Sequence, residues 1–208
     1  MSSGRAMAVF GGTFDPIHNG HLAVANEAVL ALGVDGVSFM PAGQPWLKGD
    51  RDITPARHRL RMVRLAVAAN PHFMVSTMEI DRPGPTYTVD TVERLRQQVG
   101  PAAELYFLVG GDGLRELPEW KEPWRLTGLC RLVAFGRPGA EVPVLDELET
   151  SVPGISANVI LIDVPQVDVS STEVRSRLRQ GEPISGLVPP AVEQYIRDHR
   201  LYIDGGER

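Results

Sequence analysis

The sequence predicts an α/β fold in which a mainly parallel sheet is flanked by helices. Apolar segments of strand length alternate along the chain with amphipathic segments of helical period. Strands that alternate with helices form parallel sheets through right-handed crossovers. Glycine pairs and hydroxyl-rich stretches follow several of the predicted strands. Because such sheets bind ligands beyond the carboxyl ends of their strands, these stretches are expected to converge in one cleft.

The predicted strands are short apolar runs that end at glycine, proline or a polar cluster. They cover residues 6–10, 36–41, 72–76, 104–111, 130–139 and 158–165. The predicted helices are amphipathic, and several begin at Thr, Ser or Pro or stop before Gly. They cover residues 21–32, 54–70, 88–99, 170–181 and 189–200. This alternation predicts a Rossmann-like single domain over 1–208, whose last part, from about 182 to 208, is a helical C-terminal extension.

Composition excludes several classes of protein. With 208 residues, 43% of them apolar and 23% charged, the chain is typical of a globular protein. No run of 18 or more apolar residues predicts a membrane span. The stretch "MSSGRAM" lacks the apolar core of a signal peptide, so we expect a cytoplasmic location and no membrane partner. Cys130 is the only cysteine, which rules out an intrachain disulfide and favours a core position inside its apolar strand.

The charge balance points to small ligands and away from long nucleic acids. A net charge of -5 disfavours duplex DNA or long RNA as the main partner, because such binding needs an extended basic face. A local cluster of positive groups can still bind a small anion. The sequence leaves the oligomeric state open, with a homo-oligomer as one alternative.

The stretch "GGTFDPIHNGHL" follows the first predicted strand and predicts a phosphate site. Gly11 and Gly12 permit close backbone approach and positive φ. A helix that begins near residues 19–20 offers free N–H groups and a positive dipole end. His18 and His21 then share one helical face, where each ring can donate to a phosphate oxygen. A pair of surface or capping histidines is the alternative, and a zinc helix of the H-E-x-x-H type fails on spacing and lacks the glutamate.

A second polar stretch, "VSSTEVRSRL", follows the last predicted strand and also offers groups that can bind phosphate. Ser170, Ser171 and Thr172 supply hydroxyl and backbone donors at a helix N-terminus. Arg175 lies one turn further on and can bind two phosphate oxygens at once. An ordinary Ser/Thr cap with a solvated arginine is the alternative.

The two stretches together resemble the T/H-x-G-H and S/T-S-T-x-x-R signatures of the nucleotidyltransferase superfamily. Four further stretches, "PAGQPWLK", "PGPTYTVDTVERL", "YFLVGGDGLRELPEWKEP" and "GRPG", are similar to the bacterial nicotinate-nucleotide adenylyltransferases. The resemblance runs from about residue 7 to residue 203. It implies direct transfer of AMP from ATP to nicotinate mononucleotide without a covalent intermediate, giving nicotinate adenine dinucleotide and pyrophosphate in NAD biosynthesis. Mg²⁺ is expected to accompany ATP.

The resemblance also implies residue roles on the ATP side. Four cationic or hydrogen-bonding side chains would hold the phosphates and stabilise charge during transfer: His18, His21, Lys48 and Arg175. Lys48 would reach the phosphates from the loop 41–52. The residues expected to contact ATP come from the strand ends and the two signatures: Gly11, Gly12, Thr13, Phe14, His18, His21, Gly110, Asp112, Ser170, Ser171, Thr172 and Arg175. Gly110 and Asp112 would bind the ribose.

For the acceptor, the resemblance implies a second set of contacts. The residues expected at nicotinate mononucleotide are Lys48, Thr86, Tyr87, Trp120, Lys121 and Arg137. The Trp120 indole would stack on the pyridine ring. Backbone N–H groups near Thr86 and Lys121 would receive the carboxylate, and Arg137 would pair with the phosphate.

Several residues have simpler alternatives. Trp120 could be a surface-turn aromatic, Asp112 a helix cap, and Lys48 and Arg137 solvated charges. Four arginines in the helix over 54–70 are predicted to form a solvated face: Arg57, Arg59, Arg61 and Arg64. The segment "QPWLK" departs from the P-P-H-K that is common in the family, which leaves a histidine contact in doubt and suggests Trp46 as an apolar lid.

Three other functions stay open at this point. The same chemistry could act on nicotinamide mononucleotide or on another phosphorylated acceptor. A non-catalytic nucleotide sensor would share the fold, although it would not need the charge-stabilising groups. A metallohydrolase is the least favoured, because no carboxylate cluster has the spacing of a metal cage.

Overall fold

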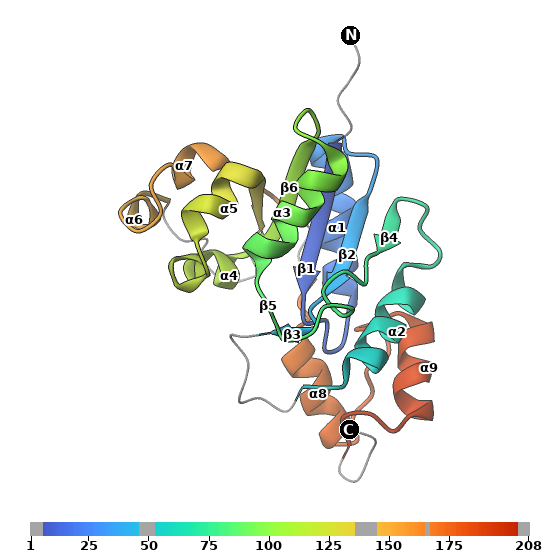
Figure 1. The fold of residues 1–208 in the computed structure, drawn as a ribbon. Helices are drawn as coiled ribbons and strands as arrows, with labels where there is room; N and C mark the ends of the chain where they lie inside the picture. Colours follow the sequence, from blue (N-terminus) through green and yellow to red (C-terminus); the bar gives the residue numbers. More distant parts are fainter. Residues whose placement is uncertain (1–5, 46–52, 136–144, 165–166, 204–208) are drawn as a thin grey trace.

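Parallel strands form the centre of the fold (Figure 1). The computed structural model describes residues 6–45, 53–135, 145–164 and 167–203. Within these ranges, one sheet has the strand order β4-β2-β1-β6-β7-β8, with every pair parallel. Its strands are β1 (Ala6–Gly12), β2 (Val37–Pro41), β4 (Phe73–Val75), β6 (Glu104–Gly110), β7 (Arg131–Phe135) and β8 (Val159–Ile162). Two short segments, β3 (Gln44–Pro45) and β5 (Pro85–Thr86), pair separately.

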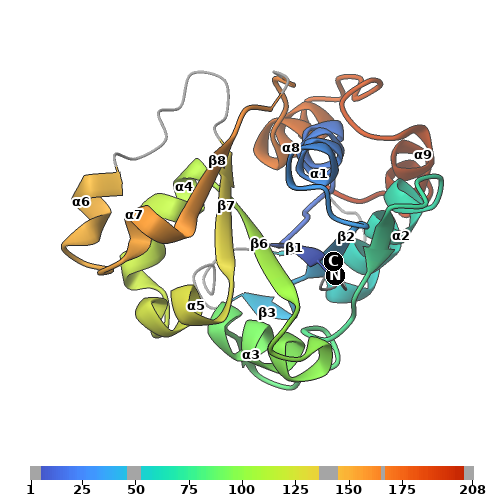
Figure 2. The ribbon, with the colours of Figure 1, turned by 90° about the horizontal axis from the view of Figure 1, so that it is seen from above.

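Helices cover both faces of this sheet (Figure 2). One face is covered by α1 (Asn19–Leu32), α2 (Ala56–Val67), α8 (Ser171–Arg179) and α9 (Pro190–Asp198). The other carries α3 (Thr88–Val99), α4 (Gly111–Arg115), the 3₁₀ turn η2 (Leu117–Glu119), α5 (Pro123–Leu129), α6 (Leu145–Glu149) and α7 (Ile155–Asn158). Among the described helices, none combines the length and the apolar composition that crossing a bilayer requires.

Side chains alternate between two apolar cores, one on each face of the sheet. In β1, Ala8 and Phe10 pack into the core under α1 and α2, whereas Val9 packs into the core under α3 and α5. A strand buried on both faces has no polar side, which explains the continuous apolar runs in the sequence. Cys130 is buried in the second core, as predicted, and burial raises the pKa of its thiol to about 12.

The predicted fold class is confirmed, and the differences are local. The helix expected over 88–99 is α3 with the same bounds. The short helices over 111–129 were not predicted, because none is long enough to show a helical period. The strand expected over 130–139 is observed as Arg131–Phe135, and the remainder of that range lies outside the described residues.

The chain order places a crevice between β1 and β6. From β1 the strands proceed outward to β2 and β4, and from β6 they proceed outward on the other side to β7 and β8. This reversal is the point at which open parallel sheets bind ligands. A Cβ atom added at Gly11 would lie 2.7 Å from the Phe107 ring. The close packing of the Phe107 ring on the β1 backbone therefore requires glycine at this position. Gly11 and Gly12 do not adopt the positive φ that glycine permits, and the left-handed residue of this loop is Phe14, with a φ of 50°.

Gly36→Ala is expected to lower the free energy of unfolding by about 2 kcal/mol, because the added methyl group would overpack against backbone that cannot move aside easily. A Cβ atom there would lie 2.3 Å from the main-chain oxygen of His72, and backbone yields less readily than a side chain. Gly128→Ala in α5 is the control, since nothing lies within 4 Å of its Cβ position. Urea unfolding of both variants measures the difference, and equal stability of Gly36→Ala and wild type would contradict the packing argument.

Candidate active site

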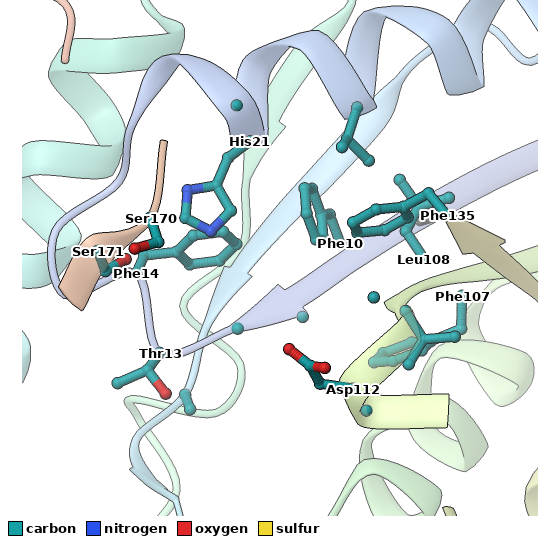
Figure 3. Close-up of a pocket in the computed structure, with 18 of the residues that line it drawn as sticks. Phe10, Thr13, Phe14, His21, Phe107, Leu108, Asp112, Phe135, Ser170 and Ser171 are labelled. Carbon is teal, nitrogen blue, oxygen red and sulfur yellow. The ribbon is translucent and has the colours of Figure 1, made fainter. Parts of the chain in front are cut away.

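A cavity of about 800 Å³ opens at the carboxyl ends of the strands. Its walls come from the loop after β1 and from the beginnings of α1, α4 and α8. Figure 3 shows Thr13, Phe14 and His21 together with Ser170 and Ser171, and Asp112 across the space from them. The two polar stretches at opposite ends of the sequence therefore line the same cavity.

The two histidines begin α1. His18 is the N-cap residue and is only 7% exposed. The two rings are stacked, with centroids 3.7 Å apart and planes inclined by 28°. The main-chain N–H of His18 donates to Nδ1 of His21 over 3.2 Å. A ring nitrogen that accepts carries no proton, so the proton of neutral His21 is on Nε2, where it can be donated to a ligand.

Aromatic packing fixes the His21 ring from the other side. Its centroid lies 5.0 Å from that of Phe14 and 5.7 Å from that of Phe10, both in edge-to-face arrangements. Figure 3 shows the imidazole between the helix and the Phe14 ring. The ring is thereby held before any ligand arrives.

The second polar stretch begins α8 and is hydrogen-bonded to the first. The Ser170 hydroxyl oxygen accepts from the main-chain N–H of Glu173 over 3.1 Å, as an N-cap does. The Ser171 hydroxyl donates to the Pro16 carbonyl over 2.9 Å, and Nη1 of Arg175 donates to the Asp15 carbonyl over 2.6 Å. The α8 N-terminus and the Arg175 guanidinium are thus fixed beside the loop that leads to His18.

Arg59 is buried, and the predicted solvated face was wrong for this residue. It is 1% exposed, and its guanidinium donates to three main-chain carbonyls in separate loops. Nε donates to Thr54 and Nη1 to Thr13, each over 2.8 Å, and Nη2 donates to Gly43 over 3.2 Å. Burial lowers the pKa of Arg59, an effect that the nearby Asp15 carboxylate opposes. The guanidinium therefore joins the loops after β1 and β2 to the segment before α2.

The far wall of the cavity contains Thr86, Trp120 and Lys121. The Trp120 ring packs edge-to-face against Phe107, with centroids 6.3 Å apart. Nζ of Lys121 lies 3.1 Å from both carboxylate oxygens of Asp90 and 4.7 Å from the centroid of the Tyr87 ring. These contacts hold the Lys121 side chain against Tyr87 and the beginning of α3.

Glu79 lines the same cavity beside Thr86. It is a buried carboxylate, and Oε1 accepts from the Thr91 hydroxyl over 2.8 Å. Its main-chain oxygen packs so closely on Gly43 that a Cβ atom there would lie 2.3 Å away. Burial raises the pKa of Glu79, and hydrogen bonds from Thr91 and Thr86 oppose the shift.

Asp112 stands in the first turn of α4, and the cap position itself is Gly110. The expected alternative of a capping aspartate therefore does not describe it. Asp112 lines the cavity, and its Oδ1 accepts from the exposed Arg115 over 3.1 Å. A carboxylate at this point can accept from ribose hydroxyls.

Comparison with known proteins gives a consistent family. The family described as Cytidylyltransferase-like matches residues 9–177. A probable nicotinate-nucleotide adenylyltransferase of Dehalococcoides mccartyi (strain CBDB1) is 47% identical over 194 residues, covering 93% of this chain and 95% of the relative. One of Roseiflexus sp. (strain RS-1) is 46% identical over 202 residues, covering 96% and 99%. The chain belongs to the nicotinate-nucleotide adenylyltransferase family.

The fold of this family member is also found at low sequence identity. The Plasmodium falciparum nicotinic acid mononucleotide adenylyltransferase complexed with NaAD superposes with a TM-score of 0.79 at 20% identity, over 95% of this chain and 97% of that one. At that identity the likeness concerns the fold.

The structure gathers most of the residues that the family resemblance names. The following all line the cavity: Gly11, Gly12, Thr13, Phe14, His18, His21, Thr86, Gly110, Asp112, Trp120, Lys121, Ser170, Ser171, Thr172 and Arg175. Tyr87 is not among the lining residues and instead packs under Lys121. Lys48 and Arg137 lie outside the described residues, as do Trp46 and Leu47 of the divergent loop.

Three buried polar residues were missed from the sequence: Asp15 and Glu79, which line the cavity, and Arg59, which does not. A signal existed for Arg59, because buried Met62 and Val63 stand three and four positions further along α2, on the same helical face. Asp15 and Glu79 lie in loops, where no period indicates which side chains point inward.

Arg59→Lys is expected to lower the free energy of unfolding by about 3 kcal/mol, because a lysine cannot satisfy all three buried carbonyls. Arg61→Lys, on the exposed face of the same helix, is the matched control and should be nearly neutral. Thermal and urea unfolding compare the two. Similar stability of both variants would show that the three carbonyls do not depend on the guanidinium.

Glu79→Gln is expected to flatten the pH dependence of stability. Because the folded pKa of Glu79 is raised, the native state binds a proton more tightly than the unfolded state does, so stability falls as pH rises from the ordinary glutamate pKa of 4.5 through the folded value. The glutamine has no such proton to lose. Unfolding measured from acid to neutral pH tests this, with exposed Glu116→Gln as the control, and an unchanged slope in Glu79→Gln would contradict it.

Proposed function

We propose that this chain transfers the AMP group of ATP to nicotinate mononucleotide, releasing pyrophosphate and forming nicotinate adenine dinucleotide for NAD biosynthesis. The proposal is carried by one observation: the two polar stretches line one cavity and are hydrogen-bonded to each other. Arg175 donates to the Asp15 carbonyl, and Ser171 donates to the Pro16 carbonyl. The relatives that share nearly the whole chain are named for this activity, and one structure of the same fold is described as complexed with NaAD.

The phosphates of ATP are proposed to lie between α1 and α8. The Nε2 proton of His21 and the His18 ring face this space from one side, and the N-terminus of α8 and Arg175 lie on the other. Helix N-termini and guanidinium groups both favour phosphate. Nη1 of Arg175 is already directed by the Asp15 carbonyl, so little side-chain freedom is lost on binding.

The proposed reaction is a direct in-line displacement. A phosphate oxygen of the mononucleotide attacks the α-phosphorus of ATP, the bond to the bridging oxygen breaks, and pyrophosphate leaves with that oxygen. Both reactants bring their own reacting groups, so the protein contributes position and charge stabilisation. His18 and His21 are held rigidly by stacking and by the His18 N–H, which suits them to stabilise charge that develops on the phosphorus.

Mg²⁺ is proposed to enter with ATP as part of the substrate. Among the described side chains there is no group of three or more histidine, cysteine, aspartate or glutamate residues that could hold a metal ion. Phosphate oxygens and water are suitable ligands for this ion, which would neutralise the charge of the leaving pyrophosphate.

The pyridine ring of the acceptor is proposed to stack on Trp120. Contact with Phe107 fixes the indole, and the Asp90–Lys121 pair fixes the next residue against the beginning of α3. Backbone N–H groups near Thr86 and Lys121 would then receive the pyridine carboxylate. Lys48 and Arg137 are proposed to contact the phosphate of the acceptor.

His18→Ala is expected to lower kcat by about two to three orders of magnitude, the size of effect seen when a charge-stabilising donor is removed. His72→Ala is the matched control, because His72 is exposed before β4 and away from the cavity. Pyrophosphate release measures both, and circular dichroism checks that they fold. Wild-type turnover in His18→Ala would refute the assigned role.

A panel of acceptors tests the function as a whole. With ATP and Mg²⁺, nicotinate mononucleotide is expected to give the highest kcat/KM and nicotinamide mononucleotide a lower value. Faster reaction of the amide would reassign the acceptor. Binding of ATP without pyrophosphate release from any acceptor would indicate a nucleotide sensor.

A further inference from the structure

The C-terminal segment, residues 182–203, is hydrogen-bonded to the chain on both sides of His18. Before the histidine, Oδ1 of Asp15 accepts from the Tyr202 hydroxyl over 2.7 Å. After it, the Asn19 main-chain N–H donates to the Leu187 carbonyl over 2.9 Å, and Nδ2 of Asn19 donates to the Gly186 carbonyl over 2.7 Å. The catalytic histidine is therefore held between two attachments to a segment that contributes no lining residue of its own to the cavity.

Asp15 connects the first of these attachments to the rest of the site. It is 6% exposed, and its other carboxylate oxygen accepts from the Thr54 N–H over 3.2 Å. Its main-chain carbonyl accepts from Nη1 of Arg175 over 2.6 Å. A change in the position of Asp15 would therefore move the approach to His18 and the guanidinium of Arg175 together.

Tyr202 is well placed to hold Asp15. After α9 the chain turns back, with the Leu201 N–H donating to the Ile196 carbonyl over 3.0 Å and the Leu201 side chain 1% exposed. Tyr202 itself has a left-handed φ of 66°, and its hydroxyl reaches Asp15 from this anchored turn. Burial, reinforced by the Asp15 carboxylate, raises the pKa of the phenol, so the hydroxyl keeps its proton and remains a donor.

The geometry points to Tyr202 as a positioning residue for the reaction: its hydroxyl holds Asp15, and through Asp15 it sets the places of His18 and Arg175. This inference rests on the proposed function, because it assigns those two side chains to the phosphates of ATP. Supporting contacts of this kind matter when a catalytic group must be fixed to within a fraction of an ångström.

Tyr202→Phe removes the hydroxyl and leaves the ring. The expected result is a fall in kcat/KM for ATP of about tenfold, in line with the cost of small misplacement at a reacting centre. KM for nicotinate mononucleotide should stay unchanged, because the wall at Thr86 and Trp120 has no contact with Asp15 among the described hydrogen bonds.

Tyr195→Phe is the matched control. It removes a second tyrosine hydroxyl from the same segment, one that lies 2.9 Å from Nδ1 of His58 and joins α9 to α2 (Figure 1). Both variants should lose similar stability, whereas only Tyr202→Phe should lose activity toward ATP. Wild-type kinetics in Tyr202→Phe, or equal losses in both variants, would overturn the inference and leave Tyr202 as an anchor of the fold.

Two further measurements keep the test decisive. If Tyr202→Phe does not fold, Asp15→Ala removes the carboxylate that the Tyr202 hydroxyl holds and keeps the main-chain carbonyl that binds Arg175, and full activity toward ATP in that variant would refute the inference. If wild type binds ATP but forms no dinucleotide, the proposed function fails, and ATP affinity then decides the inference. A weaker ATP affinity in Tyr202→Phe than in Tyr195→Phe supports it, and equal affinities overturn it.

Discussion

The cleft depends on one buried cation that holds together three separate loops. Arg59 donates to the carbonyls of Thr13, Gly43 and Thr54, and each of these belongs to a different connection at the edge of the sheet. Buried carbonyls need partners, and a guanidinium is the side chain whose planar donors can reach three of them at once. The loops of a parallel sheet have few regular hydrogen bonds of their own. The three hydrogen bonds from Arg59 therefore fix the conformation of these loops.

The sheet order determines which loops meet. Because β1 and β6 are neighbours and the chain leaves them in opposite directions, the space beyond their carboxyl ends is not closed by a crossover helix. Phe107 fills the place that a side chain on Gly11 would take, and it also supports Trp120. One aromatic ring thus connects the loop after β1 with the far wall of the cleft.

The sequence was sufficient for the fold class and for most cavity-lining residues of the two polar stretches, because strand-to-helix junctions have a strong local pattern. It was not sufficient for the buried polar residues Asp15, Arg59 and Glu79. Arg59 was predicted to be solvated because charge was given more weight than helical position, although Met62 and Val63 share its face. Asp15 and Tyr202 bond across 187 residues, and no local pattern encodes such a contact.

The hydrogen bonds between Asp15 and Arg175 and between Asp15 and Tyr202 span 160 and 187 residues of sequence. During synthesis, a chain that has emerged only as far as β8 contains both histidines but lacks α8 and the segment that fixes their loop. The same chain also lacks Val174, Val192 and Ile196, which belong to the apolar core under α1 and α2. The core on this face and the cavity are therefore completed by the same late part of the chain, so a product truncated after β8 would lack both.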